Sequence, residues 1–287
     1  MNRPIFTFIS FPLRLSLFLL GTLIIPGSHI IAQGDLLISP LRIVFEGQKK
    51  SQEINLANVG KDTASYVISI LDYRMKEDGS FEQITVPDSG QHFAGPYLRF
   101  FPRKVTLAPN EAQVVKIQLI KTNQMEPGEY RSHLYFRSVP DEKPLGEKPA
   151  KKDTAAISIQ LTPIFGITIP AIVRVGENNA SVTMSNVFFY TSSDSAKKPM
   201  LHISFNRTGN MSVYGDVKID HITKSGKSTQ AKIVKGVGVY TPNPVRNFNI
   251  ELDDNGIDYH SGKLHVTYTL QTSDKSVKVV EAEVALK

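Results

Sequence analysis

The feature that most constrains the fold is a regular succession of short stretches rich in Ile, Val, Tyr and Phe, each followed by turn-forming residues. Glycine, proline, asparagine and aspartate separate the stretches, and no long stretch has the 3.6-residue periodicity of an amphipathic helix. Val115, Ile117 and Leu119 alternate with polar residues, as the side chains of a half-buried strand do. The pattern predicts an all-β chain built from sandwiches.

The predicted strands fall into two sets, which indicates two consecutive immunoglobulin-like β-sandwich domains. The first set covers residues 36–45, 51–58, 65–73, 112–121, 130–139 and 155–169. The second set covers residues 181–190, 200–206, 212–219, 232–240, 247–252, 263–271 and 277–286. Proline, glycine and asparagine interrupt the apolar pattern between residues 170 and 179. We therefore place the boundary near Val175, with domains at 35–174 and 175–287.

Residues 1–32 have the pattern of a secretory signal peptide. Arg3 and Arg14 precede the apolar stretch 15–25, and the small residue Ala32 follows it. An uncleaved anchor is the alternative, although a membrane span needs about 20 apolar residues. Cleavage near Ala32 would lower the formal charge from +6 to +4 and release the chain into an exported compartment. The chain has no cysteine that could be acylated.

The segment 140–153 predicts a mobile loop, because it holds three prolines and four lysines and has almost nothing to bury. The strand after it, 155–169, alternates apolar and polar residues, and at about 3.3 Å per residue it is longer than one sandwich usually needs. We expect its second half, 165–169, to face the core of its own domain. Its first half can instead pair with an extended segment of another protein. The apolar residues of that half are Ile157, Ile159 and Leu161.

Three stretches carry a family pattern. In 36–60 an arginine and apolar residues precede a glycine turn: Arg42, Ile43, Val44, Phe45 and Gly47. In 100–119 the pattern P-R-x-V-x-L-x-P-x-x-x-Q is present as Pro102, Arg103, Val105, Leu107, Pro109 and Gln113. Then follow EPGEYRSHLYF, the lysine-proline loop and the alternating strand. In these stretches the chain resembles the PapD-like periplasmic pilus chaperones, and the resemblance extends over essentially the whole mature chain.

This resemblance implies an L-shaped pair of domains and a function in donor-strand complementation. Chaperones of this family lend a strand to a pilus or fimbrial subunit whose own fold lacks one, and hold it until it reaches an outer-membrane usher. The resemblance thus implies a periplasmic protein whose residues Ile157, Ile159 and Leu161 fill the subunit's groove. It also implies that Arg42 binds the subunit's C-terminal carboxylate in the cleft between the domains. Self-association through the donor strand stays open.

The sequence departs from the family pattern at the cleft. Aligned without gaps, the family's cleft lysine falls on Gly166. Either another cation, such as Lys104, Lys152 or Arg174, reaches the cleft, or the carboxylate is held more weakly, or the protein is a divergent relative that binds something else. Pro163 is a second departure, since proline lacks a ladder donor and is tolerated only at an edge or bulge. The alternative is an exported two-domain structural or adhesion module without chaperone activity.

The sequence contains no pattern that predicts catalysis. Without cysteine, thiol catalysis and Cys-liganded zinc are impossible. The seven histidines are scattered, and no HExxH, P-loop, G-x-S-x-G or G-x-G-x-x-G pattern occurs. The basic residues lack an aromatic stacking platform, which argues against nucleic acid. We expect a binding protein that is not an enzyme, with no cofactor, no metal and no stable membrane insertion after signal cleavage.

Overall fold

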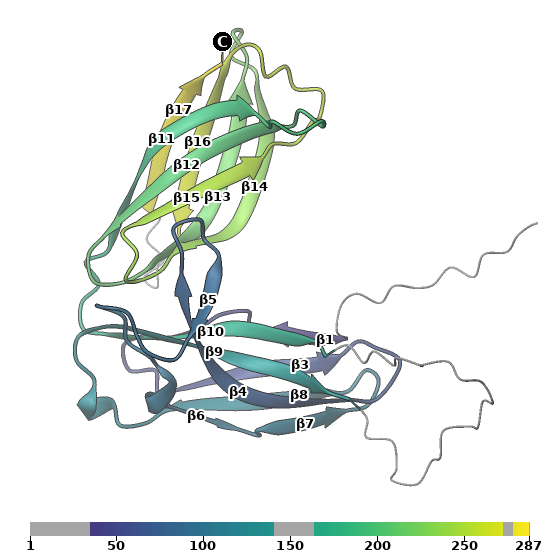
Figure 1. The fold of residues 1–287 in the computed structure, drawn as a ribbon, viewed down its shortest axis with the longest axis vertical. Helices are drawn as coiled ribbons and strands as arrows, with labels where there is room; N and C mark the ends of the chain where they lie inside the picture. The colour runs from purple at the N-terminus through teal and green to yellow at the C-terminus, as the bar shows by residue number, and fades with distance from the viewer. Residues whose placement is uncertain (1–34, 141–163, 272–277, 287) are drawn as a thin grey trace, which may run out of the picture. The chain divides into compact units, whose positions relative to one another are not determined.

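The computed structural model describes residues 35–140, 164–271 and 278–286 (Figure 1). Residues 1–32 of the expected signal peptide, almost all of the expected loop 140–153, and Ile157, Ile159 and Leu161 lie outside the described residues. The described residues form strands and two 3-10 turns, arranged as four sheets that make two sandwiches. The prediction of an all-β chain with two sandwiches is confirmed.

The first sandwich has one sheet in the order β1-β3-β8-β6 and a second in the order β2-β10-β9-β4-β5, with β7 also paired to β4. The strands of the first sheet are β1 (Leu36–Ser39), β3 (Ser51–Asn58), β8 (Ala112–Leu119) and β6 (Leu98–Phe101). Those of the second are β2 (Ile43–Phe45), β10 (Gly166–Val175), β9 (Gly128–Val139), β4 (Ala64–Met75), β5 (Phe81–Ile84) and β7 (Lys104–Leu107). Alternate residues of these strands are buried between the sheets, as the period of two requires.

The second sandwich pairs a sheet of order β11-β12-β15 with one of order β14-β13-β16-β17. Its strands are β11 (Ser181–Thr191), β12 (Pro199–Thr208), β15 (Val245–Glu251), β14 (Ser228–Val239), β13 (Val213–Ile222), β16 (Lys263–Leu270) and β17 (Lys278–Ala285). Its core is separate from the first and includes the fully buried Phe205 and Tyr268. The Tyr268 hydroxyl satisfies its donor by bonding to the Val237 carbonyl at 2.7 Å.

Two strand predictions for the first sandwich are corrected, and three short strands were not predicted. The expected strand 36–45 is two strands, because Pro40 has no N–H to continue the ladder and the chain passes there from one sheet to the other. The strand expected to end at 169 continues to Val175. The short strands β5, β6 and β7 have four residues each, too few to show a periodicity.

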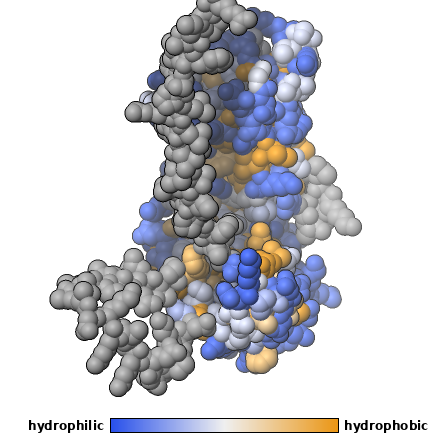
Figure 2. Space-filling view, turned by 90° about the vertical axis from the view of Figure 1, so that its right-hand side faces the viewer, coloured by the Kyte–Doolittle hydropathy of each residue, from blue (hydrophilic) through white to orange (hydrophobic). Residues whose placement is uncertain are grey.

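A small apolar cluster joins the two sandwiches. Met75 at the end of β4, Ile172 in β10 and Tyr240 after β14 are buried together, with the partly buried Val44 packed against them. The Asn243 side-chain amide adds a 2.5 Å hydrogen bond to the Met75 carbonyl. Elsewhere the visible described surface is largely hydrophilic, interrupted by a few apolar groups (Figure 2). The described residues belong to one compact unit.

Candidate functional site

Arg42 lies directly before β2, at the place where this short strand joins β10. In β2, Ile43 and Phe45 point into the first core and are almost completely buried. Because side chains alternate along a strand, Arg42 and Val44 lie on the opposite face. That face meets the second sandwich through the apolar cluster around Tyr240.

The Arg42 guanidinium stacks on aromatic rings of the second sandwich. Its central carbon lies 4.0 Å from the centre of the Tyr214 ring and 5.8 Å from that of Tyr240. The Arg42 Nε is buried and has no hydrogen-bond partner among the described residues. The side chain lines a pocket of about 390 Å³, together with Leu41, Glu46, Tyr214 and Gln271. A guanidinium held this way can still donate to a carboxylate or phosphate.

The first half of β10 has an unpaired edge. β9 pairs with β10 along its whole length, from Gly166 to Val175, whereas β2 pairs with residues 171–173 alone. Within the described part of the chain, residues 166–170 therefore have a strand neighbour on one side only. This edge is roughly 17 Å long at about 3.3 Å per residue. It stops where β2 begins, which is where Arg42 lies.

The side chains of β10 follow the expected alternation only in part. Ile169 is 1% exposed and Ile167 packs against the same core, as predicted. Phe165 was expected to face this core, but it is 37% exposed. The reason is its position before the first residue of β10, where the chain is held by Ser138: the Phe165 amide donates to Ser138 Oγ at 2.9 Å. The predicted groove-filling residues precede this point and lie outside the described residues.

Gly166 has no room for a lysine side chain in this arrangement. A Cβ built there would lie 2.2 Å from the ring of Tyr135, which crosses β10 from β9. Of the three cations considered as substitutes, Lys152 lies outside the described residues and Lys104 pairs in β7 with Val67 of β4. Arg174 instead contacts Glu129 and the Ser212 carbonyl.

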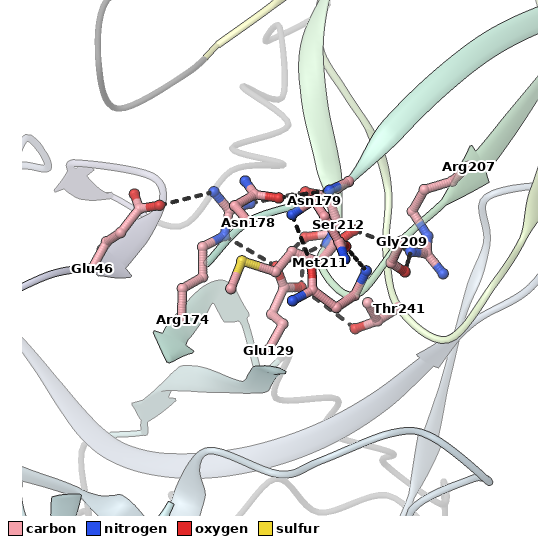
Figure 3. Close-up of polar contacts among 12 residues, drawn as sticks. Glu46, Glu129, Arg174, Asn178, Asn179, Arg207, Gly209, Met211, Ser212 and Thr241 are labelled. Carbon is pink, nitrogen blue, oxygen red and sulfur yellow. Dashed lines mark hydrogen bonds and ion pairs between the residues drawn. The ribbon is translucent and has the colours of Figure 1, made fainter. Parts of the chain in front are cut away.

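Arg174 takes part in a buried polar network that joins the sandwiches (Figure 3). Its Nε lies 3.2 Å from Glu129 Oε2, and its terminal nitrogen donates to the Ser212 carbonyl at 2.9 Å. Glu129 of β9 also accepts hydrogen bonds from the Ser212 amide at 3.0 Å and hydroxyl at 2.5 Å. The Glu129 side chain is 0% exposed. The Arg174–Glu129 ion pair of the first sandwich and Ser212 of the second therefore form each other's hydrogen bonds in a site shielded from water.

Arg207 stiffens the second-sandwich side of this network. It donates to four backbone carbonyls, those of Gly209 at 2.7 Å, Met211 at 3.1 Å, Asn243 at 2.9 Å and Pro242 at 3.2 Å. These bonds tie the loop before Ser212 to the loop that follows Tyr240. The two rings that contact Arg42 adjoin these loops: Tyr214 lies near the start of β13 and Tyr240 directly follows β14.

A second arginine, which was not predicted from the sequence, borders the same Tyr240 ring as Arg42. Arg131 of β9 is 2% exposed and its guanidinium carbon lies 4.5 Å from the centre of the Tyr240 ring, on which Arg42 also borders. Its Nε and one terminal nitrogen have no partner among the described residues. Burial lowers the pKa of Arg131, and the Arg42 charge contributes in the same direction. In the sequence, the available signal was a charged residue, Arg131, inside the predicted strand 130–139. The structure shows that this strand is buried on both faces there.

Over residues 35–140, 164–271 and 278–286, no group of three His, Asp or Glu side chains is placed to hold a metal ion. No helix in those ranges is long and apolar enough to cross a membrane.

Comparison with known proteins gives matches among solved structures only. No protein-family model matches the chain, and no curated protein matches it. The E. coli chaperone DraB is 14% identical, with 88% of this chain and 96% of that chain covered and a TM-score of 0.42. The class 5 fimbriae chaperone CfaA is 16% identical, with 88% and 99% covered and a TM-score of 0.40. The chaperone–tip adhesion subunit complex of the Csu pili of Acinetobacter baumannii matches at 11% identity, with 86% and 97% covered and a TM-score of 0.42. The three matched structures are a chaperone, a chaperone of class 5 fimbriae and a complex that contains a pilus chaperone.

Proposed function

We propose that this protein is a periplasmic chaperone that holds fimbrial or pilus subunits by donating a strand to them, without catalysis or a cofactor. The observation that carries the proposal is the unpaired edge of β10, residues 166–170. A sheet edge with alternating apolar side chains is a template for an added strand. The sequence continues that alternation upstream through Ile157, Ile159 and Leu161.

The position of Arg42 supports a particular direction for the added strand. β2 runs parallel to β10 and begins where the free edge stops. A partner strand that is collinear with β2 and parallel to β10 would therefore end beside Arg42. Its C-terminal carboxylate would meet a guanidinium that stacks on Tyr214 and whose Nε has no partner among the described residues. Arg42 would then anchor the carboxylate while the upstream apolar residues fill the groove of the subunit.

The proposal rests on association chemistry that needs no ATP. Burying each apolar side chain of the donated strand contributes about 1.5–3 kcal/mol before ordering costs are subtracted. A charge-assisted hydrogen bond to the carboxylate adds about 1.5–3 kcal/mol. The subunit would be released at an outer-membrane usher when a strand from another protein replaces the donated strand in the groove of the subunit. The Csu complex named above pairs a chaperone with a tip adhesion subunit, and a subunit of that kind is the partner we propose.

The test is capture of exported proteins on the tagged chaperone, with the bound proteins identified by mass spectrometry. The variant Ile157→Asp, Ile159→Asp, Leu161→Asp should lose small immunoglobulin-like subunits that the wild type retains. The matched control is Val114→Asp, Ile233→Asp, Val279→Asp, which places three aspartates at apolar residues that are each 45% exposed. Circular dichroism checks that both variants are folded. If both triple variants keep the same subunits, strand donation is wrong.

Arg42 is tested by affinity for a captured subunit. Arg42→Ala should weaken binding by about tenfold to a hundredfold, the equivalent of about 1.5–3 kcal/mol. Arg99 lies exposed on β6 of the other sheet, so Arg99→Ala should bind as the wild type does. Equal affinity of all three proteins would remove Arg42 from the binding site and leave an interaction module that binds elsewhere.

A further inference from the structure

A second pocket lies where the β4–β5 hairpin reaches the second sandwich. It has a volume of about 310 Å³. Its walls include Tyr73, Phe81, His133, Thr168, Tyr240 and Arg246, and we call it the hairpin pocket. Ligand pockets measure about 300–1,000 Å³, so this one has room for a small molecule or a single side chain.

The hairpin forms the pocket by closing against Arg246. The turn between β4 and β5 is held by a 2.9 Å bond from the Gly79 amide to the Lys76 carbonyl. Gly79 has a φ of +83°, and a Cβ there would lie 2.6 Å from Arg246 Nε. A glycine is thus required both by the backbone conformation and by the close approach of the arginine. The turn tip covers Arg246 while its side chain still lines the pocket.

The walls are aromatic: Phe81 lies edge to face with Tyr73 and His133 and is tilted relative to Tyr240. The Phe81 ring lies 6.3 Å from Tyr73, 5.8 Å from His133 and 6.1 Å from Tyr240, measured between ring centres. Phe81 is nevertheless 46% exposed, although it stands among these rings. A flat apolar group inserted beside Phe81 would remove apolar surface from water on both partners.

Two arginines without a direct carboxylate contact among the described residues lie at this aromatic space, Arg246 in the pocket wall and Arg131 behind it. Among the described residues, neither Arg131 nor Arg246 has a carboxylate within 4.0 Å. Arg246 donates to the Gly238 carbonyl at 2.6 Å, and its Nε has no partner in the described chain. Arg131 lies behind the wall, 4.5 Å from the Tyr240 ring centre and 5.9 Å from that of Phe81. Asp78 acts on the charge of Arg246, and Glu129 and Asp72 act on that of Arg131, each from beyond 4.0 Å. A carboxylate bound in the pocket would be the first to contact Arg246 directly.

His133 adds an unpartnered polar group inside the pocket. It is 6% exposed, and its Nδ1 is buried with no hydrogen-bond partner among the described residues. Burial lowers its pKa to about 3, and the charge of Arg131 acts in the same direction. The ring is therefore neutral at physiological pH and offers one donor and one acceptor.

We propose that the hairpin pocket binds a carboxylate carried on a flat apolar group, with the carboxylate at Arg246 and the apolar group against Phe81 and Tyr240. A free aromatic acid and the carboxyl-terminal residue of a chain share this chemistry. Thr168 of the free edge of β10 borders the pocket, but Arg246 and Phe81, which carry this proposal, lie outside that edge, and Arg42 does not line the pocket. Arg246→Met therefore tests this proposal separately from strand donation. Loss of one function by mutation should leave the other measurable.

The experiment is isothermal titration calorimetry of the purified protein with two acids and their amides. Benzoate against benzamide represents the free acid, and N-acetylphenylalanine against its amide represents a chain end. At least one acid should bind about tenfold or more tightly than its amide, because a charge-assisted bond is lost in the neutral compound. The acid that shows this preference identifies the source.

Three variants locate the binding. Arg246→Met should weaken the acid by about tenfold and bring it to the level of the amide, while Arg246→Lys should keep part of the preference. Thr168 is exposed and lines the pocket, so Thr168→Phe should fill the space and abolish binding of acid and amide without removing a structural contact. Arg99→Met is the control for loss of a charge and should bind as the wild type does.

The proposal is overturned by any of three results. They are equal affinity for acid and amide, undiminished binding by Thr168→Phe, and no binding of either acid at millimolar concentration. If Arg246→Met fails to fold, Thr168→Phe and the acid–amide comparison on the wild type still decide the question.

Discussion

Burial of the His133 ring determines its protonation state in the folded protein. His133 lies in β9 on the face opposite the first core, and the second sandwich and the β4–β5 hairpin bury it to 6% exposure. The Tyr73 ring packs edge to face on it with 4.9 Å between ring centres. Because protonation would place a charge in this apolar space beside Arg131, the folded protein keeps the ring neutral.

This gives a pH dependence of stability that His133 should dominate. Its pKa is lowered to about 3 in the folded protein, against about 6.5 in an unfolded chain. The unfolded chain therefore binds the proton first, and stability falls as the pH drops from about 6.5 toward 3, by about 1.4 kcal/mol per pH unit. Urea unfolding at pH 7.5 and pH 5.0 should show a loss of about 2 kcal/mol that His133→Gln removes.

The control for that measurement is His260→Gln, at an exposed histidine of the second sandwich. This variant should keep the wild-type difference between the two pH values. If His133→Gln keeps it as well, protonation of His133 does not account for the acid sensitivity.

At the scale of an element, the pair β9–β10 depends on one small residue. Tyr135 lies opposite Thr168 in the ladder, and its ring crosses the position of Gly166. Gly166→Ala should destabilise the protein by about 1–3 kcal/mol, because the added methyl overlaps the ring and the ring has to move.

A double-mutant cycle with Tyr135→Ala tests this by urea unfolding. In the Tyr135→Ala background the overlap is gone, so Gly166→Ala should cost little there, and the coupling between the two changes should be about 0.5–3 kcal/mol. Additive effects of the two substitutions would mean that the ring does not block this position. The same overlap explains why a lysine is not accommodated at residue 166 without rearrangement of Tyr135.

At the scale of the whole molecule, the two sandwiches are coupled through Glu129. Its carboxylate has partners in both, Arg174 in β10 and Ser212 before β13. Glu129→Ala should lower the free energy of unfolding by about 3–5 kcal/mol, because it leaves a nearly buried guanidinium and a buried serine without their anion. Two separate transitions in differential scanning calorimetry would accompany the loss of coupling.

The matched control is Glu251→Gln, which removes the exposed pair with Lys198 at 2.8 Å. An exposed pair of this kind contributes little to stability, so this variant should unfold as the wild type does. Similar losses for Glu129→Ala and Glu251→Gln would show that the buried network is not what joins the sandwiches.

The sequence by itself determined the elements and their class, because periodicity and turn residues are local properties of the chain. It located most of the long strands, the arginine of the first motif and the absence of a lysine at residue 166. It did not show that Pro40 divides one strand between two sheets, or that Phe165 lies beyond the core.

Only the tertiary structure decided which polar residues meet across the two sandwiches. Glu129 and Ser212 are 83 residues apart in sequence, and Arg131 and Thr241 are 110 apart, yet each pair is joined by a hydrogen bond. No local pattern encodes such pairs, since they depend on how two separately built cores come together. The free edge of β10 also depends on residues far apart in sequence. It is free because its partner strand β2, more than 120 residues earlier, is too short to cover it.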